Sequence, residues 1–190
     1  MANPKILVMP GSTREGSFNT QLANAAVRSI EACGGAATLV NLADYPMDFV
    51  DGGNSSGDMP SAVAELHAKF AAHDGILLIT PEYNSFPSPL LLNALDWLSR
   101  VRHYEGGMDE VFGRPLYAVC AASPSPIGGY RALMALRQKL GIGLGATVIP
   151  AMAHIAAAYE AFDANGELKS DANKAMLDKV VNQLCARLGA

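Results

Sequence analysis

Short runs of apolar residues alternate along the chain with longer segments whose apolar residues recur at helical spacing. The apolar runs predict buried strands, which span residues 5–9, 37–42, 75–80, 116–122 and 146–149. The amphipathic segments predict helices, which span residues 18–32, 62–72, 87–101, 129–140 and 170–188. In the first helix, for example, Phe18, Leu22 and Ile30 fall on one stripe. The pattern is therefore a strand followed by a helix, repeated along the chain.

This order predicts the fold class. Continuous apolar strands that are separated by helices indicate a parallel sheet with helices on both faces. Right-handed crossovers then leave few topologies, and five such units favour a flavodoxin-like, doubly wound, five-stranded sheet of order 2-1-3-4-5. We expect residues 1–190 to form one domain, because no repeat or linker divides them. Residues 150–169 are poorly patterned, and we expect them at an edge or an interface.

Composition and charge narrow the class of protein. The chain has 190 residues, of which 50% are hydrophobic and 17% are charged, and a net charge of −4. High apolar content with low charge excludes a disordered chain. The first apolar run is far shorter than the ~20 residues of a membrane-spanning helix, and we see no leader, so we expect a cytoplasmic protein without a membrane partner. We expect no nucleic-acid partner either, because no basic stripe is visible.

The three cysteines give no sign of a metal site. Cys33, Cys120 and Cys185 lie far apart, and neither a CxxC pair nor a His/Cys cluster at zinc spacing is present. We therefore expect buried thiols in a reducing compartment and no bound metal.

The loop after the first predicted strand has the composition of an anion site. Residues 11–19 contain small residues, hydroxyls and one arginine, and they lead into a helix N-terminus. Backbone N–H groups and the helix dipole favour an anion there. Ser12, Arg14, Ser17 and Asn19 can add donors, which together suit a terminal phosphate. An ordinary capped turn with Ser17 as N-cap explains the same residues equally well. The motif is neither a P-loop nor GxGxxG.

Two further loops lie at the same predicted edge of the sheet. Residues 80–89 include three prolines with Tyr83 and Phe86, so a rigid loop with an exposed aromatic could hold a planar ring. The alternative is a proline-rich turn with both aromatics in the core; we favour a functional role for Tyr83 and Asn84, and core packing or an oligomer contact for Phe86.

After the fourth strand, Ser123 and the Gly128–Gly129 pair could approach the same ligand, although a simple helix-start turn also fits. Together, the three loops favour a planar cofactor that carries a phosphate.

Four motifs carry a resemblance to a known family. They are GSTREGSFN at 11–19, PEYN at 81–84, LNALDW at 92–97 and SPSPIGGYRALMALR at 123–137. The chain resembles the NADPH-dependent FMN reductase family, in the branch of bacterial quinone, chromate and azo reductases. The resemblance implies noncovalent FMN, a phosphate held by Ser12, Arg14, Ser17 and Asn19, and a ring lined by Pro81, Glu82, Tyr83 and Asn84, with Ser123 and Gly128 at its other edge. Leu92 and Phe86 depart from the family pattern, where lysine and serine are usual.

The resemblance also implies an activity. Hydride from NADPH or NADH would reach FMN and then a quinone, flavin or azo-type acceptor at the same place, with ping-pong kinetics. It implies a homodimer or homotetramer and a small-molecule acceptor. The alternatives are a flavodoxin-like FMN electron carrier without direct NAD(P)H turnover, and a non-catalytic sensor or scaffold of the same fold. NAD(P)H oxidation without a partner protein would exclude the carrier.

No catalytic side chain is predicted. Asp96 next to Trp97 is interpreted as structural rather than as one of a carboxylate pair. The Arg100, Arg102 and His103 cluster could meet a nucleotide 2′-phosphate, but cations are favoured at any helix C-terminus, so we interpret it as a solvated helix end. Ser123 is not a hydrolase nucleophile, because no GxSxG motif surrounds it.

Overall fold

The chain is described here by a computed structural model, which places residues 3–53, 59–101 and 106–189. Arg102 and His103 of the predicted cationic cluster lie outside these residues. The elements follow one another as β1 (Lys5–Pro10), α1 (Phe18–Ala32), β2 (Ala36–Leu39), η1 (Leu42–Asp44), α2 (Ser61–Ala71), β3 (Gly75–Ile79), β4 (Glu82–Tyr83), β5 (Phe86–Pro87), α3 (Pro89–Leu98), η2 (Asp109–Gly113), β6 (Leu116–Ala122), α4 (Tyr130–Gln138), η3 (Lys139–Gly143), β7 (Thr147–Ile155), α5 (Ala158–Ala161) and α6 (Asp171–Leu188).

Five parallel strands form the main sheet in the order β2-β1-β3-β6-β7. This is the predicted order 2-1-3-4-5, which the structure confirms. In the centre, Val8 of β1 is aligned with Leu39 of β2 on one side and with Leu77 of β3 on the other. The residues of β3 are all buried, as expected for a central strand with helices on both faces.

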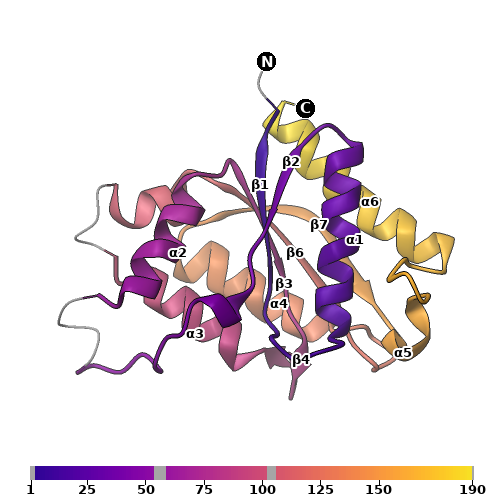
Figure 1. Cartoon of the computed structure of the whole chain (residues 1–190), viewed down its shortest axis with the longest axis horizontal. Helices are drawn as coiled ribbons and strands as arrows, with labels where there is room; N and C mark the ends of the chain where they lie inside the picture. The colour runs from indigo at the N-terminus through magenta and orange to yellow at the C-terminus, as the bar shows by residue number, and fades with distance from the viewer. Residues whose placement is uncertain (1–2, 54–58, 102–105, 190) are drawn as a thin grey trace.

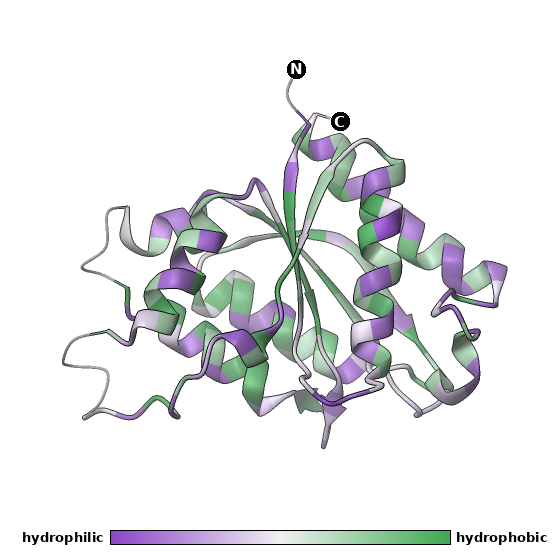
Figure 2. Cartoon of the chain, in the orientation of Figure 1, coloured by the Kyte–Doolittle hydropathy of each residue, from purple (hydrophilic) through white to green (hydrophobic). Residues whose placement is uncertain are grey.

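Helices cover both faces of the sheet and divide the core into two layers. Alternate residues of β1 point to opposite faces, because side chains of a strand alternate. Ile6 packs with residues of α1 and α6, whereas Leu7 packs with residues of α2, α3 and α4. Figure 1 shows these two groups of helices on either side of the sheet. The central strands are hydrophobic along most of their length, while α1 and α6 alternate between hydrophobic and hydrophilic residues (Figure 2).

The last strand is longer than its hydrophobic pattern predicts. We expected residues 146–149, but β7 runs from Thr147 to Ile155 and passes through Pro150. β7 is an edge strand, so its exposed and buried residues alternate and no continuous apolar run marks it. An edge also tolerates proline, and the pairing with β6 shifts register between Tyr117 and Val119. The poorly patterned stretch therefore supplies part of the sheet and the short helix α5.

Two of the three cysteines are paired, which corrects the expectation of three thiols. Cys33 ends α1 and Cys185 lies in α6, and the two are joined as a disulfide with Cα atoms 6.9 Å apart. α1 and α6 pack on the same face of the sheet, which brings the two cysteines together. They are 152 positions apart in the sequence, so their spacing does not predict the pairing. Cys120 is a buried free thiol in β6, and burial raises its pKa to about 12, so it stays protonated.

None of the helices in the described part of the chain is both long enough and apolar enough to cross a membrane.

Candidate functional site

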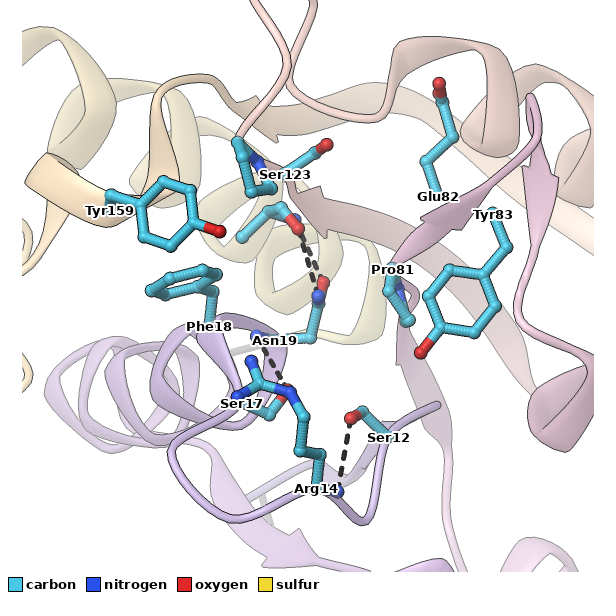
Figure 3. Close-up of a pocket in the computed structure, with 12 residues that line it drawn as sticks. Ser12, Arg14, Ser17, Phe18, Asn19, Pro81, Glu82, Tyr83, Ser123 and Tyr159 are labelled. Carbon is cyan, nitrogen blue, oxygen red and sulfur yellow. Dashed lines mark hydrogen bonds between the residues drawn. The ribbon is translucent and has the colours of Figure 1, made fainter.

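A pocket of about 290 Å³ lies at the carboxyl ends of β1, β3 and β6, where ligands bind in open parallel sheets. Its wall comes from the three loops identified in the sequence, from the start of α1 and from α5. Eight of the ten predicted site residues line it, and Figure 3 shows them with two aromatic residues. The lining residues are Ser12, Arg14, Ser17, Phe18, Asn19, Pro81, Glu82, Tyr83, Ala122, Ser123, Pro124 and Tyr159.

The first loop carries unpaired donors at one end of this pocket, which Phe18 lines, and in a neighbouring cavity, which Glu15 and Gly16 line together with Ser12 and Arg14. Ser17 is the N-cap of α1, and its Oγ accepts a hydrogen bond from the Asn19 N–H at 3.2 Å. Within the described chain, the backbone N–H groups of Glu15, Gly16 and Phe18 have no hydrogen-bond acceptor. They lie next to the Arg14 guanidinium, which reaches only the Glu15 carbonyl at 3.2 Å. Unpaired N–H groups, a helix N-terminus and one cation are the groups that suit an anion such as a phosphate.

Asn19 joins the first loop to the loop that follows β6, the fourth strand along the sheet order, which we call the fourth loop. Its side chain is buried, its Nδ2 donates to the Ala122 carbonyl at 3.0 Å, and its Oδ1 accepts from the Ala122 N–H at 2.9 Å. One hydrogen of the amide remains for a ligand. The pair holds the start of α1 against the end of β6, so Asn19 sets the spacing between two walls of the pocket.

The loop after β3 is a small hairpin rather than an irregular turn. Tyr83 of β4 pairs with Phe86 of β5, and the two turn residues Asn84 and Ser85 have φ values of 51° and 72°. Positive φ at both positions is the geometry of a tight two-residue hairpin, which asparagine tolerates. Asn84 therefore occupies the hairpin tip and does not line the pocket. Tyr83 and Phe86 are both exposed, so the alternative that buries them in the core is wrong.

Glu82 contributes to the pocket wall, but its carboxylate points away from it (Figure 3). The side chain is only 4% exposed. Its Oε1 accepts hydrogen bonds from two Arg131 nitrogens, the Nε at 3.0 Å and the Nη2. Its Oε2 accepts a hydrogen bond from the Ala132 N–H at 3.2 Å. The N-cap of α4 is Gly129, which has no side chain to cap the helix, so Glu82 accepts from a free N–H of the first turn and anchors the hairpin to this helix start.

The loop after β6 places one of its two predicted residues in the pocket. Ser123 is buried at the pocket wall, and its Oγ accepts from the Ser125 N–H at 3.2 Å. Gly128 does not line the pocket. Its φ is +62°, and a Cβ there would lie 2.7 Å from the backbone C and O atoms of His154. Close approach to β7 explains this glycine.

Two aromatic residues of the pocket were not assigned to it from the sequence. Phe18 falls on the apolar stripe of the first helix, and Tyr159 lies in the poorly patterned stretch, so no local signal distinguishes them. The two rings meet edge to face, with centroids 5.1 Å apart and planes at 84°. The Arg14 guanidinium lies 5.8 Å from the centre of the Phe18 ring. This cation–π contact places Arg14 beside the aromatic wall.

The pocket contains the groups of a binding site rather than those of a metal centre. Over residues 3–53, 59–101 and 106–189, no three His, Cys, Asp or Glu side chains come together in a way that could hold a metal ion.

Comparison with known proteins agrees with this geometry. A family model described as NADPH-dependent FMN reductase matches residues 4–160. A quinone reductase of Escherichia coli K12 is 32% identical over 136 residues, which cover 72% of this chain and 69% of that protein. An NAD(P)H-dependent FMN reductase of Pseudomonas aeruginosa is 29% identical over 180 residues, or 95% and 92% of the two chains.

Solved structures show the same fold at lower sequence identity. FerB, a flavoenzyme NAD(P)H:(acceptor) oxidoreductase of Paracoccus denitrificans, is similar with a TM-score of 0.79 and 24% identity over 97% of each chain. The apo form of an NADH:FMN oxidoreductase, EmoB, has a TM-score of 0.73 and 18% identity, and covers 99% of this chain and 91% of that one.

Proposed function

The chain belongs to the NADPH-dependent FMN reductase family, and from this premise we propose that the pocket at the carboxyl edge of its sheet binds FMN and receives a quinone as electron acceptor. As a member of that family, the protein is an FMN-dependent NAD(P)H oxidoreductase. The assignment of FMN depends on the unpaired N–H groups of the first loop, whose residues Ser12 and Arg14 line both this pocket and the cavity next to it. The name of the 32% identical relative supports the quinone.

The residues present fit the phosphate of FMN. The Arg14 guanidinium and the hydroxyls of Ser12 and Ser17 converge with the unpaired N–H groups of the first loop. Hydrogen bonds in which one partner is charged are the stronger kind, so this end of the pocket would supply most of the specific affinity. The remaining Asn19 amide hydrogen can join them. The backbone of α1 is held by Asn19 and Ala122, so the donors are positioned before the ligand arrives.

The other walls would hold the flavin ring. Pro81 and Tyr83 stand on the hairpin side, and Ser123 stands on the side of the fourth loop (Figure 3). Glu82 would support the ring site indirectly, because its contacts with Arg131 and Ala132 hold the hairpin in place. When bound, FMN supplies the redox chemistry, taking hydride from NAD(P)H and passing two electrons to the acceptor. The chain itself binds, orients and shields; we assign no side chain as acid or base.

One pocket would serve both co-substrates in turn. The walls come from three loops and α5, which line one pocket. Residues 1–190 would act as one FMN-binding domain. NAD(P)H would therefore give up its hydride and leave as NAD(P)+ before the quinone enters, which predicts ping-pong kinetics. The relatives reported above are reductases and give no support to an electron carrier.

The test is spectroscopic. The purified protein is reconstituted with FMN and mixed anaerobically with NADPH or NADH, and then with a naphthoquinone. We expect a bound-flavin band that bleaches rapidly and returns with the quinone, without a partner protein. Arg14→Ala should lose bound FMN, whereas Arg28→Ala should keep it, because Arg28 pairs with Glu167 outside the pocket. A bound band that never bleaches would contradict the reductase, and no bound band would contradict the site.

We also infer a homodimer or homotetramer. Phe86, Met134 and Ile142 are exposed apolar residues, and Phe86 and Ile142 line one shallow cavity of about 350 Å³ beside α4. Exposed apolar surface of this kind is typical of an interaction site. Light scattering should give a mass of two or four times 19.9 kDa, and Phe86→Asp should lower it. A monomer at all concentrations would contradict the inference.

We infer a cytoplasmic location, because the reaction uses NAD(P)H. Fractionation of cells that express the protein tests it, and recovery outside the cytoplasmic fraction would contradict it.

A further inference from the structure

The short helix α5 follows a residue in an uncommon backbone conformation. Ala157 has φ 47° and ψ 46°, in the left-handed region that residues other than glycine rarely adopt. Hydrogen bonds to the fourth loop hold this turn: the Ala158 N–H donates to the Ser123 carbonyl at 3.2 Å, and the Ala157 N–H reaches the Ser125 carbonyl at 3.5 Å. Such conformations cost energy and persist only where the surroundings enforce them, often at functional sites.

The consequence of the turn is the placement of Tyr159. Ala158 and Ala161 on either side of it are buried against the sheet, so α5 is anchored by its inner face. Tyr159 points outward, is 77% exposed and lines the pocket. Figure 3 shows its hydroxyl directed towards the pocket interior, with Tyr83 on the opposite wall.

The Tyr159 ring is braced by another ring and is otherwise free. Phe18 meets it edge to face at 5.1 Å, and Phe18 is itself fixed as the first residue of α1. No residue in the described parts of the chain forms a hydrogen bond with the Tyr159 hydroxyl. The ring therefore has a fixed support and an accessible surface, which suits contact with a ligand that enters and leaves. The groups expected to hold the FMN phosphate, by contrast, are hydroxyls, backbone N–H groups and Arg14.

We propose that Tyr159 is a specificity-determining residue of this pocket, and that its ring is the aromatic wall on which a planar acceptor such as a quinone stacks. This inference rests on the proposed FMN site. Stacked aromatic rings attract each other beyond simple burial of area, whereas an acceptor without a planar ring gains nothing from such a wall. Tyr159 would thus favour planar acceptors without taking part in the electron transfer.

The experiment compares two acceptors on the FMN-loaded enzyme with saturating NADPH. Menadione is the planar acceptor, and ferricyanide, an octahedral anion that takes one electron per ion, is the non-planar one. Tyr159→Ala should raise the KM for menadione by about 2- to 12-fold, the range that an aromatic pair provides. The ferricyanide kinetics and the FMN dissociation constant should stay unchanged. Tyr159→Phe keeps the ring and should behave like the unmodified protein. Phe49→Ala is the control, since Phe49 is 76% exposed but outside the pocket lining.

Several results would overturn the inference. Equal losses with both acceptors, or no loss with either, would show that the ring does not select planar molecules. A higher FMN dissociation constant in Tyr159→Ala would place the ring in the cofactor site. An equal effect of Tyr159→Phe would assign the role to the hydroxyl. Failure of the unmodified protein to bind FMN would refute the proposed function itself, and it is seen before any variant is compared.

Discussion

Glu82 links the hairpin beside the pocket to the start of α4, and its removal gives a prediction with a calculable size. The variant Glu82→Gln keeps the shape of the side chain and removes its charge. Its ion-pair partner Arg131 is 55% exposed, so solvent screens this part of the loss, which is ~0.5 kcal/mol. Loss of a negative charge at the start of α4 costs ~0.5 kcal/mol more. The hydrogen bond from the Ala132 N–H becomes a neutral one, which costs ~1 kcal/mol in this buried position.

The total is about 2 kcal/mol, which corresponds to a fall in Tm of about 4–8 °C for a chain of this length. Thermal unfolding followed by circular dichroism measures it. Glu110→Gln is the matched control, because Glu110 pairs with Arg114 at 2.9 Å on the surface, where both side chains are 37% exposed. Its loss should be only ~0.3–0.5 kcal/mol.

A double-mutant cycle with Arg131→Gln separates the ion pair from the effect on the helix start. The coupling free energy should be ~0.5 kcal/mol, which is less than the loss in Glu82→Gln alone. If Glu82→Gln unfolds within 1 °C of the unmodified protein, the carboxylate does not anchor the hairpin and the reasoning fails.

Three further predictions follow from single contacts. Arg14→Ala should weaken FMN binding by ~1.5–3 kcal/mol, or about 10- to 150-fold, in a fluorescence-quenching titration; unchanged affinity would remove Arg14 from the site. Gly128→Ala should destabilise the protein by ~3 kcal/mol, because φ is +62° there and the new Cβ meets the His154 backbone. The control Gly166→Ala also lies at positive φ but has open space around it, so it should lose only ~1–2 kcal/mol. Equal losses of stability in thermal unfolding would refute the close approach of Gly128 to His154. Thiol titration in denaturant should find one thiol before reduction and three after it; three thiols beforehand would contradict the Cys33–Cys185 disulfide.

The fold was predictable because its main determinants are local. A central strand of a parallel sheet is apolar along its whole length, so β3 and β6 stand out in the sequence, and β6 was predicted with its observed bounds. The first helix was also predicted from Phe18 to Ala32, since its stripe and its Ser17 cap lie within one segment. β7 was predicted too short, because an edge strand with one neighbour has no such run.

The residues of the pocket also divide into those that a local pattern predicted correctly and those that it did not. Ser12, Arg14 and Ser17 were predicted for the site from one short motif, and all three line the pocket, because the groups that suit an anion at a helix N-terminus lie within a few residues of each other. Asn84 was assigned to the ligand from the same kind of local evidence, but the structure places it at a hairpin tip outside the pocket lining. The sequence could not separate the two cases, since asparagine suits both a turn and a ligand.

By itself, therefore, the sequence determined the order of the sheet, the edge at which the pocket lies and the loop whose composition suits a phosphate. The tertiary structure decided which side chains reach that pocket. Glu82 turns away because its partner Arg131 lies 49 positions further on, and Tyr159 joins the wall because the turn at Ala157 brings α5 to the fourth loop. Local patterns in the sequence indicate which residues are buried or cap a helix. Contacts between distant segments arise only when the helices and loops pack on the sheet.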